Sequence, residues 1–310
     1  MTDLRFGVSL VPIRDLDATR RLAAVAEQAG MEYIGVQDHP YVARYLDAFV
    51  VMGDLLARTE RIQVFPDVAN LPLRPPAVLA RTASALSRVS GGRFQLGLGA
   101  GGYWDAIESM GAARRTPPEA LRALEEAVAI VRGLWRADTR VDHDGEFYRV
   151  HGVGGQEPGP GGVEIWVGAQ GPRSLALTGR LADGWAAPIP SYLPYERWAG
   201  SNEALDRAAR GAGRDPADVR RIAQLVGTVE VGAVASGPLG RSGDDPVRAG
   251  VAGWVELVTR LATEQPFTTF VLWPQRADER QIRLFAEEVA PAVRERVGPG
   301  RAAALRTAGE

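Results

Sequence analysis

Short apolar runs alternate with longer amphipathic segments along almost the whole chain. The run from Met31 to Val36, for example, follows residues 15–29, whose apolar positions recur at helical spacing and end at Gly30. The pattern predicts strands over residues 4–11, 31–36, 62–68, 94–100, 163–169, 184–189, 222–231 and 268–273. It predicts helices over residues 15–29, 47–58, 77–89, 117–135, 173–182, 195–212, 246–263 and 278–297.

This strict alternation indicates the fold class. Strands that are apolar on both faces and joined through helices are typical of a parallel sheet that is covered all round. Eight such units close into a barrel. We therefore expect an α/β protein, a single (β/α)8 TIM barrel that spans residues 1–310 as one domain. An open doubly wound sheet is the alternative, but it rarely needs eight regular units without a second domain.

Two segments interrupt the alternation. Residues 139–151 contain an Asp-Gly turn between alternating positions, which predicts a hairpin inserted between the fourth helix and the fifth strand and continuing into a loop. Residues 232–245 form a glycine-rich connection after the seventh strand, which we expect to be mobile. Both segments could cover the mouth of a barrel or decorate its surface.

The composition is that of a packed globular protein, with 45% hydrophobic and 24% charged residues. A formal net charge of -2 gives no reason to expect nucleic acid or an acidic membrane surface as a partner. No window approaches the ~18 continuous apolar residues of a membrane span, and the N-terminus lacks the basic start and cleavage site of a signal peptide. We therefore expect a cytoplasmic protein.

Two residue types are missing. The absence of cysteine excludes disulfides, thiolate nucleophiles and cysteine-ligated metal sites. There is no lysine either, since all 36 basic residues are arginine, and this excludes Schiff-base chemistry and the lysine of a P-loop. Three histidines remain, His39, His143 and His151, so a histidine-based site has few possible positions.

The strand ends carry the candidate chemistry, because active sites of such barrels lie where the strands end. The exits read Asp38-His39-Pro40-Tyr41, Pro66-Asp67-Val68-Ala69-Asn70, Gly99-Ala100-Gly101-Gly102, Ala169-Gln170-Gly171-Pro172-Arg173 and Trp273-Pro274. This rim is rich in glycine and aromatic residues and nearly free of paired carboxylates. It suits a flat organic cofactor better than a metal, and we expect no metal site.

Two of these exits contain glycine motifs. Residues 97–102, GLGAGG, match the dinucleotide fingerprint, but no strand with a terminal acid follows at the expected distance of ~20 residues. A close backbone approach or a tight turn are the other interpretations. Residues 170–173, QGPR, lead straight into a helix, so backbone N–H groups and Arg173 could bind a phosphate. A plain strand–helix turn with a surface arginine remains open.

His39 is the only imidazole at a predicted strand exit. It could act in acid–base chemistry, serve as a structural histidine or ligate a metal. A metal centre on this fold needs several imidazoles, whereas His143 and His151 fall in the hairpin and are interpreted as surface residues. The sequence contains no nucleophile elbow, and no pair of carboxylates stands at neighbouring strand exits. Hydrolysis therefore has little support.

The chain resembles the bacterial luciferase-like superfamily of flavin- and deazaflavin-dependent oxidoreductases, and within it the branch that uses coenzyme F420. The resemblance runs along nearly the whole chain. Its most specific segments are 36-VQDHPY-41, 68-VANLPLRPPAVLART-82, 91-GGRFQLGLGAG-101, 144-DGEFYRV-150, 165-IWVGAQGPRSL-175 and 179-GRLADGW-185.

The resemblance implies which residues surround the cofactor. Asp38 and His39 match a pair that lies by the ring, where the histidine is often assigned an acid–base part, and both are candidate catalytic residues. Asp67-Val68 matches a strand-three bulge that often holds a non-prolyl cis peptide backing the ring. The remaining cofactor-binding candidates are Asn70, Ala100 and Gly101 at the rim, and Ala169, Gln170, Gly171, Pro172 and Arg173 in the phosphate-binding turn.

The same resemblance bears on the substrate. The aromatic residues Tyr41, Tyr45, Trp104, Trp185 and Trp273 are available for an apolar or aromatic substrate pocket, although each could instead be a packed core residue. Ala100 stands where some relatives have threonine, and no lysine can bind an anionic sugar phosphate. A sugar-phosphate dehydrogenase is therefore not expected.

These expectations define the predicted activity. The first hypothesis is hydride transfer between coenzyme F420 and a small organic substrate. The second is an FMN-dependent monooxygenase on the same scaffold, and the third is a barrel that binds flavin without turnover. The resemblance also suggests a homodimer.

Overall fold

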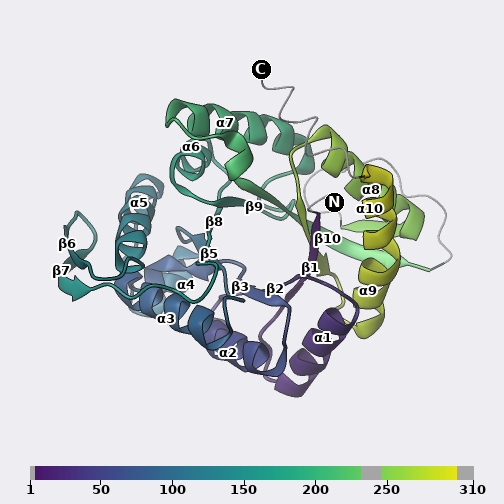
Figure 1. The fold of residues 1–310 in the computed structure, drawn as a ribbon, viewed down its shortest axis with the longest axis horizontal. Coiled ribbons are helices and arrows are strands. Elements are labelled where there is room, and N and C mark those ends of the chain that lie inside the picture. The colour runs from purple at the N-terminus through teal and green to yellow at the C-terminus, as the bar shows by residue number, and fades with distance from the viewer. Residues whose placement is uncertain (1–3, 232–245, 299–310) are drawn as a thin grey trace. The chain divides into compact units, whose positions relative to one another are not determined.

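The computed structural model describes residues 4–231 and 246–298, so the predicted connection at 232–245 lies outside the described residues. The chain divides into two compact units. Of the described residues, unit 1 comprises 4–10, 17–35, 169–231 and 246–298, and unit 2 comprises 11–16 and 36–168. In both units strands and helices alternate along the chain, as the hydrophobic pattern predicts (Figure 1).

The strands of unit 1 form parallel pairs. In hydrogen-bonded order they are β2 (Tyr33–Val36), β1 (Arg5–Leu10), β12 (Thr269–Pro274), β10 (Arg220–Glu230) and β9 (Gly184–Ala187). Phe6 of β1 is in register with Phe270 of β12, and their rings lie 5.6 Å apart. Phe285 packs edge-on against Phe6, so this face of the two strands forms the core under the last helices.

The helices of unit 1 follow their strands. They are α1 (Leu16–Gln28), α6 (Pro172–Leu181), α7 (Trp198–Gly211), α8 (Val251–Glu264), α9 (Glu279–Arg283) and α10 (Ala290–Val297). Short 3-10 turns lie at Tyr195–Arg197 and Pro216–Asp218, and a π-helical segment, Leu284–Val289, joins α9 to α10. The predicted helix over 278–297 is therefore not one continuous α-helix, because its middle part is π-helical.

One predicted helix start in unit 1 is wrong. The pattern placed it at residue 246, but Val247–Gly250 form a short strand, β11, that pairs in parallel with β10. The strand β10 runs to Glu230, and its last four residues provide the backbone partners for β11. The helix α8 begins only after this pairing ends, at Val251.

Unit 2 contains the second set of elements. Its strands are β3 (Gln63–Pro66), β4 (Ala69–Asn70), β5 (Leu96–Gly99) and β8 (Ile165–Gly168), with β5 parallel to both β4 and β8. Its helices are α2 (Ala48–Arg58), α3 (Pro76–Val89), α4 (Trp104–Ser109) and α5 (Pro117–Leu134), with a 3-10 turn at Leu71–Leu73. The predicted strand over 62–68 corresponds to β3, while β4 lies beyond its predicted end, and α4 was not predicted.

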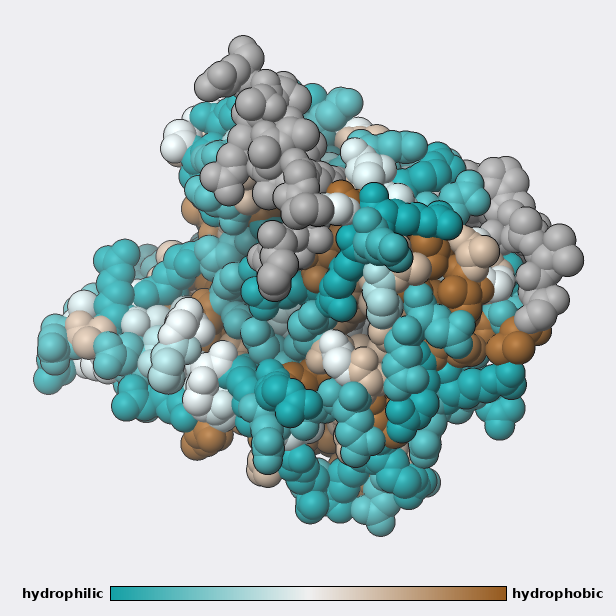
Figure 2. Space-filling view, turned by 45° about the vertical axis from the view of Figure 1, so that its right-hand side comes forward, coloured by the Kyte–Doolittle hydropathy of each residue, from teal (hydrophilic) through white to brown (hydrophobic). Residues whose placement is uncertain are grey.

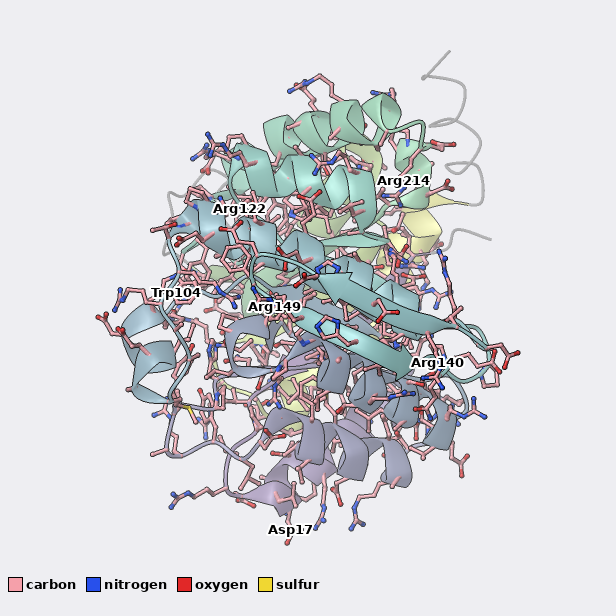
Figure 3. The ribbon with its side chains drawn as sticks, turned by 90° about the vertical axis from the view of Figure 1, so that its left-hand side faces the viewer. Asp17, Trp104, Arg122, Arg140, Arg149 and Arg214 are labelled. Atoms are coloured by element: carbon pink, nitrogen blue, oxygen red, sulfur yellow. The ribbon has the colours of Figure 1, made fainter. Side chains whose placement is uncertain are left out.

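The predicted hairpin is confirmed. Strands β6 (Arg140–Asp144) and β7 (Arg149–Gly154) pair antiparallel and lie along α5 (Figure 1). Figure 3 shows this hairpin with Arg140 and Arg149 on it. Glu126 of α5 accepts hydrogen bonds from the backbone N–H groups of Glu146, Phe147 and Tyr148, which fixes the hairpin turn on the helix.

In the part of the chain that the structure describes, no helix is both long and apolar enough to cross a membrane. The face in Figure 2 is largely hydrophilic, with apolar residues gathered only in small patches.

Candidate active site

The carboxyl end of β2 leads into a tight turn in unit 2. The Val42 N–H donates to the His39 carbonyl at 2.9 Å, with Pro40 and Tyr41 as the two central residues of the turn. Proline fixes its own φ near the value that the first central position requires. The turn folds the Tyr41 side chain back onto His39, so the side chains of these two residues, which stand two positions apart in the sequence, are in contact.

His39 and Tyr41 share a short hydrogen bond. The distance from His39 Nδ1 to Tyr41 Oη is 2.7 Å, and among the described residues His39 Nε2 has no hydrogen-bond partner. Burial disfavours the imidazolium and lowers the pKa of His39 below its usual 6.5, although the charge of Asp38 acts in the opposite direction. The lowered pKa favours the neutral imidazole, and Nε2 is the ring nitrogen without a partner among the described residues.

Asp38 has a different environment from its neighbour. Its carboxylate is buried and forms a bidentate ion pair with Arg74, at 2.7 Å for both Nε and one terminal nitrogen. The backbone N–H of Asn70 donates to the same carboxylate at 2.9 Å. The Asp38 carboxylate thus accepts three hydrogen bonds, two from Arg74 and one from the Asn70 N–H. It ties the end of β2 to the end of β4.

Arg74 joins a third element to this pair. It donates to Asp47 at 2.8 Å, and its guanidinium lies 4.3 Å from the centre of the Phe49 ring. Burial disfavours the charge on Arg74, but the two aspartates outweigh it and raise the pKa of Arg74 above its ordinary value. Asp47 also caps α2 by accepting from the N–H groups of Phe49 and Val50. The sequence reasoning missed Arg74, although it stands within one of the segments that resemble the family.

The junction of β3 and β4 lies beside this network. The peptide between Asp67 and Val68 is cis, as the resemblance implied. The Asp67 N–H donates to the carbonyl of Val36 at 2.8 Å, which places the junction against the end of β2. Asp67 and Asn70 are both buried.

The glycines of β5 accommodate this junction. A Cβ atom at Gly97 would lie 2.1 Å from the Pro66 carbonyl oxygen, and one at Gly99 would lie 2.8 Å from a methyl group of Val68. Both distances are too short for any side chain. The GLGAGG stretch is thus explained by close backbone approach, one of the interpretations left open, and the dinucleotide interpretation is not needed.

The exit of β5 brings further aromatic rings to the turn. Gly101 adopts a φ of 100°, and the Trp104 ring packs within about 3 Å of where a Cβ would stand there. Trp104 begins α4, as Figure 3 shows. Tyr103 precedes it and lies edge-on to His39, with ring centres 5.7 Å apart, and 6.0 Å from Tyr41. Tyr103 was not among the predicted site residues.

One polar atom of unit 2 lacks a partner where a cofactor is expected. Asn70 Oδ1 is buried, and within residues 4–231 and 246–298 it accepts no hydrogen bond. A buried acceptor left in this way costs free energy unless a ligand or water donates to it. Both F420 and FMN carry a ring N–H flanked by carbonyl groups, so the residues present fit either cofactor at this position.

The predicted phosphate turn belongs to unit 1. Pro172 begins α6, and Ser174 Oγ accepts from the Gly171 N–H at 3.1 Å. Gln170 and Arg173 are exposed, while Ala169 is buried, with its carbonyl accepting from Trp185 Nε1 at 2.8 Å. The first-turn N–H groups of Arg173 and Ser174 have no carbonyl one turn earlier in the helix to bond. The turn therefore has the local features that anion binding requires.

The predicted aromatic residues have different environments. Trp185 is fully buried in unit 1, where its ring packs 5.9 Å from that of Phe267 and its N–H is used, so it is a core residue. Trp273 is half-buried at the end of β12, and its Nε1 atom is buried without a partner among the described residues. Tyr45 pairs through its backbone with Ile13 and stacks with Arg44.

The other two histidines lie on the hairpin, His143 on β6 and His151 on β7. His143 Nε2 is 3.4 Å from Glu126 Oε2. Over residues 4–231 and 246–298, no cluster of three or more histidine, aspartate or glutamate residues is arranged to hold a metal ion.

Comparison with known proteins shows which family and which relatives this chain resembles. The family model described as "Luciferase-like monooxygenase" matches residues 2–230. The 5,10-methylenetetrahydromethanopterin reductase of Archaeoglobus fulgidus is 32% identical over 183 residues, 58% of this chain and 52% of the relative. The F420-dependent glucose-6-phosphate dehydrogenase of Nocardia farcinica is 34% identical over 172 residues, 53% of this chain and 51% of the relative. The chain thus spans about half the length of these curated relatives.

Solved structures resemble the chain over a longer span. An F420-dependent secondary alcohol dehydrogenase in complex with an F420-acetone adduct has a TM-score of 0.80 at 19% identity, covering 94% of this chain and 99% of that one. The monooxygenase RslO1 from Streptomyces bottropensis has a TM-score of 0.75 at 19% identity, covering 93% and 99%. These likenesses show the fold, and the predicted (β/α)8 TIM barrel is confirmed. The family-model match over residues 2–230 shows that the chain belongs to the luciferase-like family.

Proposed function

We propose that this protein is an oxidoreductase that transfers a hydride between coenzyme F420 and a small apolar or aromatic organic substrate. The observation that carries the proposal is the position of His39, partly buried just after β2 with Nδ1 on the Tyr41 hydroxyl and with Nε2 without a partner among the described residues. The F420-dependent relatives and the F420-dependent structural neighbour support the choice of cofactor. When bound, the reduced cofactor supplies a hydride.

The residues of unit 2 have distinct parts in this proposal. His39 donates or accepts the proton that accompanies the hydride, because a neutral imidazole in a half-buried site can do both near pH 7. Asp38, whose carboxylate is occupied by Arg74 and Asn70, holds the end of β2 in place rather than exchanging protons itself. Val68, Ala100 and Gly101 would line the ring, and the unpaired Asn70 Oδ1 would accept a hydrogen bond from a ring N–H.

The residues proposed for the substrate are apolar or aromatic. Tyr41, Tyr103 and Trp104 stand around His39 and the exit of β5. Trp273, at the end of β12 in unit 1, stays a prediction for the substrate pocket, and its buried Nε1 atom has no partner among the described residues. A sugar phosphate is not proposed, because the side chains around His39 are aromatic, and glucose 6-phosphate serves as the negative control in substrate tests.

The turn of residues 169–173 in unit 1 is proposed to bind a phosphate of the cofactor. The support is its exposed Arg173 at the start of α6, together with the first-turn N–H groups. Arg173→Ala removes a charge-assisted contact expected to contribute ~1.5–3 kcal/mol, and the dissociation constant is then expected to rise by about tenfold or more. A change in the dissociation constant of less than about twofold would contradict phosphate binding at this turn.

A second candidate is an FMN-dependent monooxygenase. The description of the matched family model and the structural likeness to RslO1 favour it. The unpaired Asn70 acceptor fits FMN as well as F420. A third candidate is flavin binding without turnover, which predicts tight cofactor binding and no change in any rate for His39→Ala. The homodimer and the cytoplasmic location implied by the sequence stay predictions.

Titration of the apoprotein with each cofactor, followed by fluorescence, tests the proposal. We expect saturable F420 binding and FMN binding that is weaker by at least about tenfold, or ~1.4 kcal/mol. Micromolar FMN binding without F420 binding would replace the first candidate by the second.

A further inference from the structure

The short contact between His39 and Tyr41 has a direction. A phenol is a much stronger acid than a neutral imidazole, and an imidazole nitrogen is a much better acceptor than a phenol oxygen. The distance of 2.7 Å between Nδ1 and Oη fits donation in either direction, and this difference in acidity favours donation from the Tyr41 O–H to Nδ1. The single proton of the neutral imidazole then sits on Nε2, and His39 faces a ligand as a donor.

The carboxylate next to His39 does not compete for this position. Asp38 is engaged by both nitrogens of the Arg74 fork and by the Asn70 N–H. In many histidine sites a carboxylate holds the second ring nitrogen and favours the charged imidazolium. Here the Tyr41 hydroxyl occupies that position, and a hydroxyl, unlike a carboxylate, can donate a proton to the ring nitrogen.

A neutral imidazole that donates from Nε2 needs a proton at Nδ1 at the same time. Loss of the Nε2 proton alone would leave an imidazolate, which is far too basic to form near pH 7. The Tyr41 hydroxyl at 2.7 Å is the group that can supply the second proton. Tyr103, the other phenol against His39, meets the imidazole edge-on with ring centres 5.7 Å apart and is half exposed to solvent.

We propose that Tyr41 is a proton-relay residue acting through His39, and that the substrate oxygen it serves belongs to a carbonyl group or the corresponding alcohol. The inference rests on the proposed hydride transfer and adds to it the class of substrate and the source of the proton.

The step balances in atoms and electrons. A hydride adds to the carbonyl carbon, and the π electrons of the C=O bond move to oxygen. The oxygen takes the proton from His39 Nε2, while Nδ1 takes the proton from the Tyr41 hydroxyl. The ring stays neutral throughout, and the tyrosinate left behind recovers a proton from water. Alcohol oxidation runs through the same transfers in reverse.

The direction of the hydrogen bond can be measured without any cofactor. The chain has only three histidines, so nitrogen-15 labelling of histidine gives a spectrum in which the protonated nitrogen of each ring is identified. In the apoprotein, above the pKa of His39, we expect the proton on Nε2. Tyr41→Phe keeps the ring and removes the hydroxyl, so we expect the preference for Nε2–H to be lost.

A matched variant separates the hydroxyl from the aromatic packing. Tyr103→Phe removes a hydroxyl from the neighbouring ring, and we expect the Nε2–H tautomer to persist there. A wild-type spectrum with the proton on Nδ1, or a Tyr41→Phe spectrum that still shows Nε2–H, overturns the relay. This readout is independent of the cofactor, so failure of the proposed F420 chemistry is distinguished from failure of the hydrogen-bond assignment.

The second readout is turnover of a carbonyl substrate by the loaded enzyme. For Tyr41→Phe we expect kcat to fall by about 100-fold, with cofactor affinity unchanged. The solvent deuterium isotope effect on kcat should also change, because two protons move in the wild type and one donor is missing in the variant. A Tyr41→Phe enzyme with unchanged kcat and unchanged isotope effect overturns the proposal.

Discussion

Two histidines of unit 2 show how the partner decides the use of an imidazole. His143, on the hairpin, lies 3.4 Å from the carboxylate of Glu126, which also accepts three backbone N–H groups. His39, at the end of β2, lies 2.7 Å from a phenol, while the carboxylate beside it is bound to Arg74. The first arrangement fastens a hairpin to a helix. The second leaves one nitrogen of the imidazole without a partner among the described residues, and burial lowers the pKa of that imidazole.

The difference between the two histidines depends first on Arg74, because Arg74 binds the carboxylate of Asp38, the residue next to His39. Arg74→Ala leaves the Asp38 side chain, 1% exposed, without its counter-ion, and we expect a loss of ~3–5 kcal/mol in unfolding free energy. Arg122→Ala breaks the exposed Arg122–Glu146 pair and should cost less than about 1 kcal/mol. Chemical denaturation of both variants measures the difference. Equal losses would show that Arg74 is an ordinary surface arginine.

The next prediction concerns catalysis by the two histidines. His39→Asn should lower kcat by about 100-fold or more, because it removes the proton donor while keeping a polar side chain. His143→Asn should leave kcat within about twofold, since nothing in its surroundings involves a strand exit. Steady-state kinetics with a saturating cofactor measures both. A similar effect of the two substitutions would remove His39 from the chemistry.

Glu126 tests the other half of the comparison. Burial alone would raise its pKa, but the backbone N–H donors of the hairpin turn outweigh it and hold the pKa of Glu126 below the usual 4.5. Glu126→Ala should cost ~1–3 kcal/mol of stability and speed amide exchange at residues 146–148. The exposed neighbour provides the control, Glu125→Ala, with little expected change. Unchanged exchange at the turn would contradict the fastening role.

The smallest effect is a pH dependence of stability from His39. Its folded pKa lies below 6.5, so as pH falls through 6.5 the unfolded chain takes up a proton that the folded protein resists. The stabilising contribution of neutral His39 is therefore present above pH 6.5 and declines below it. Between roughly pH 7.5 and 5.5, wild type should lose more unfolding free energy than His39→Asn. The lowered carboxyl pKa values of Glu126 and Asp47 act below pH 4.5 and do not interfere.

Much of this arrangement could be predicted from the sequence, because strand–helix alternation is a local signal. The pattern located the exit of β2, and the scarcity of histidines singled out His39 there. The contacts that give these residues their properties are non-local. Arg74 is one of 36 basic residues, all arginine, and only the folded chain shows that it reaches Asp38. The strand β11 was missed for the same reason, since its four residues become a strand only through pairing with β10.

The most direct test of the account is the histidine spectrum during titration with F420. A cofactor bound at the end of β2 changes the surroundings of His39 and leaves the hairpin untouched. We predict that the His39 signals shift saturably, with the dissociation constant found by fluorescence, while the His143 and His151 signals stay in place. Saturable F420 binding with an unchanged His39 signal would contradict the account.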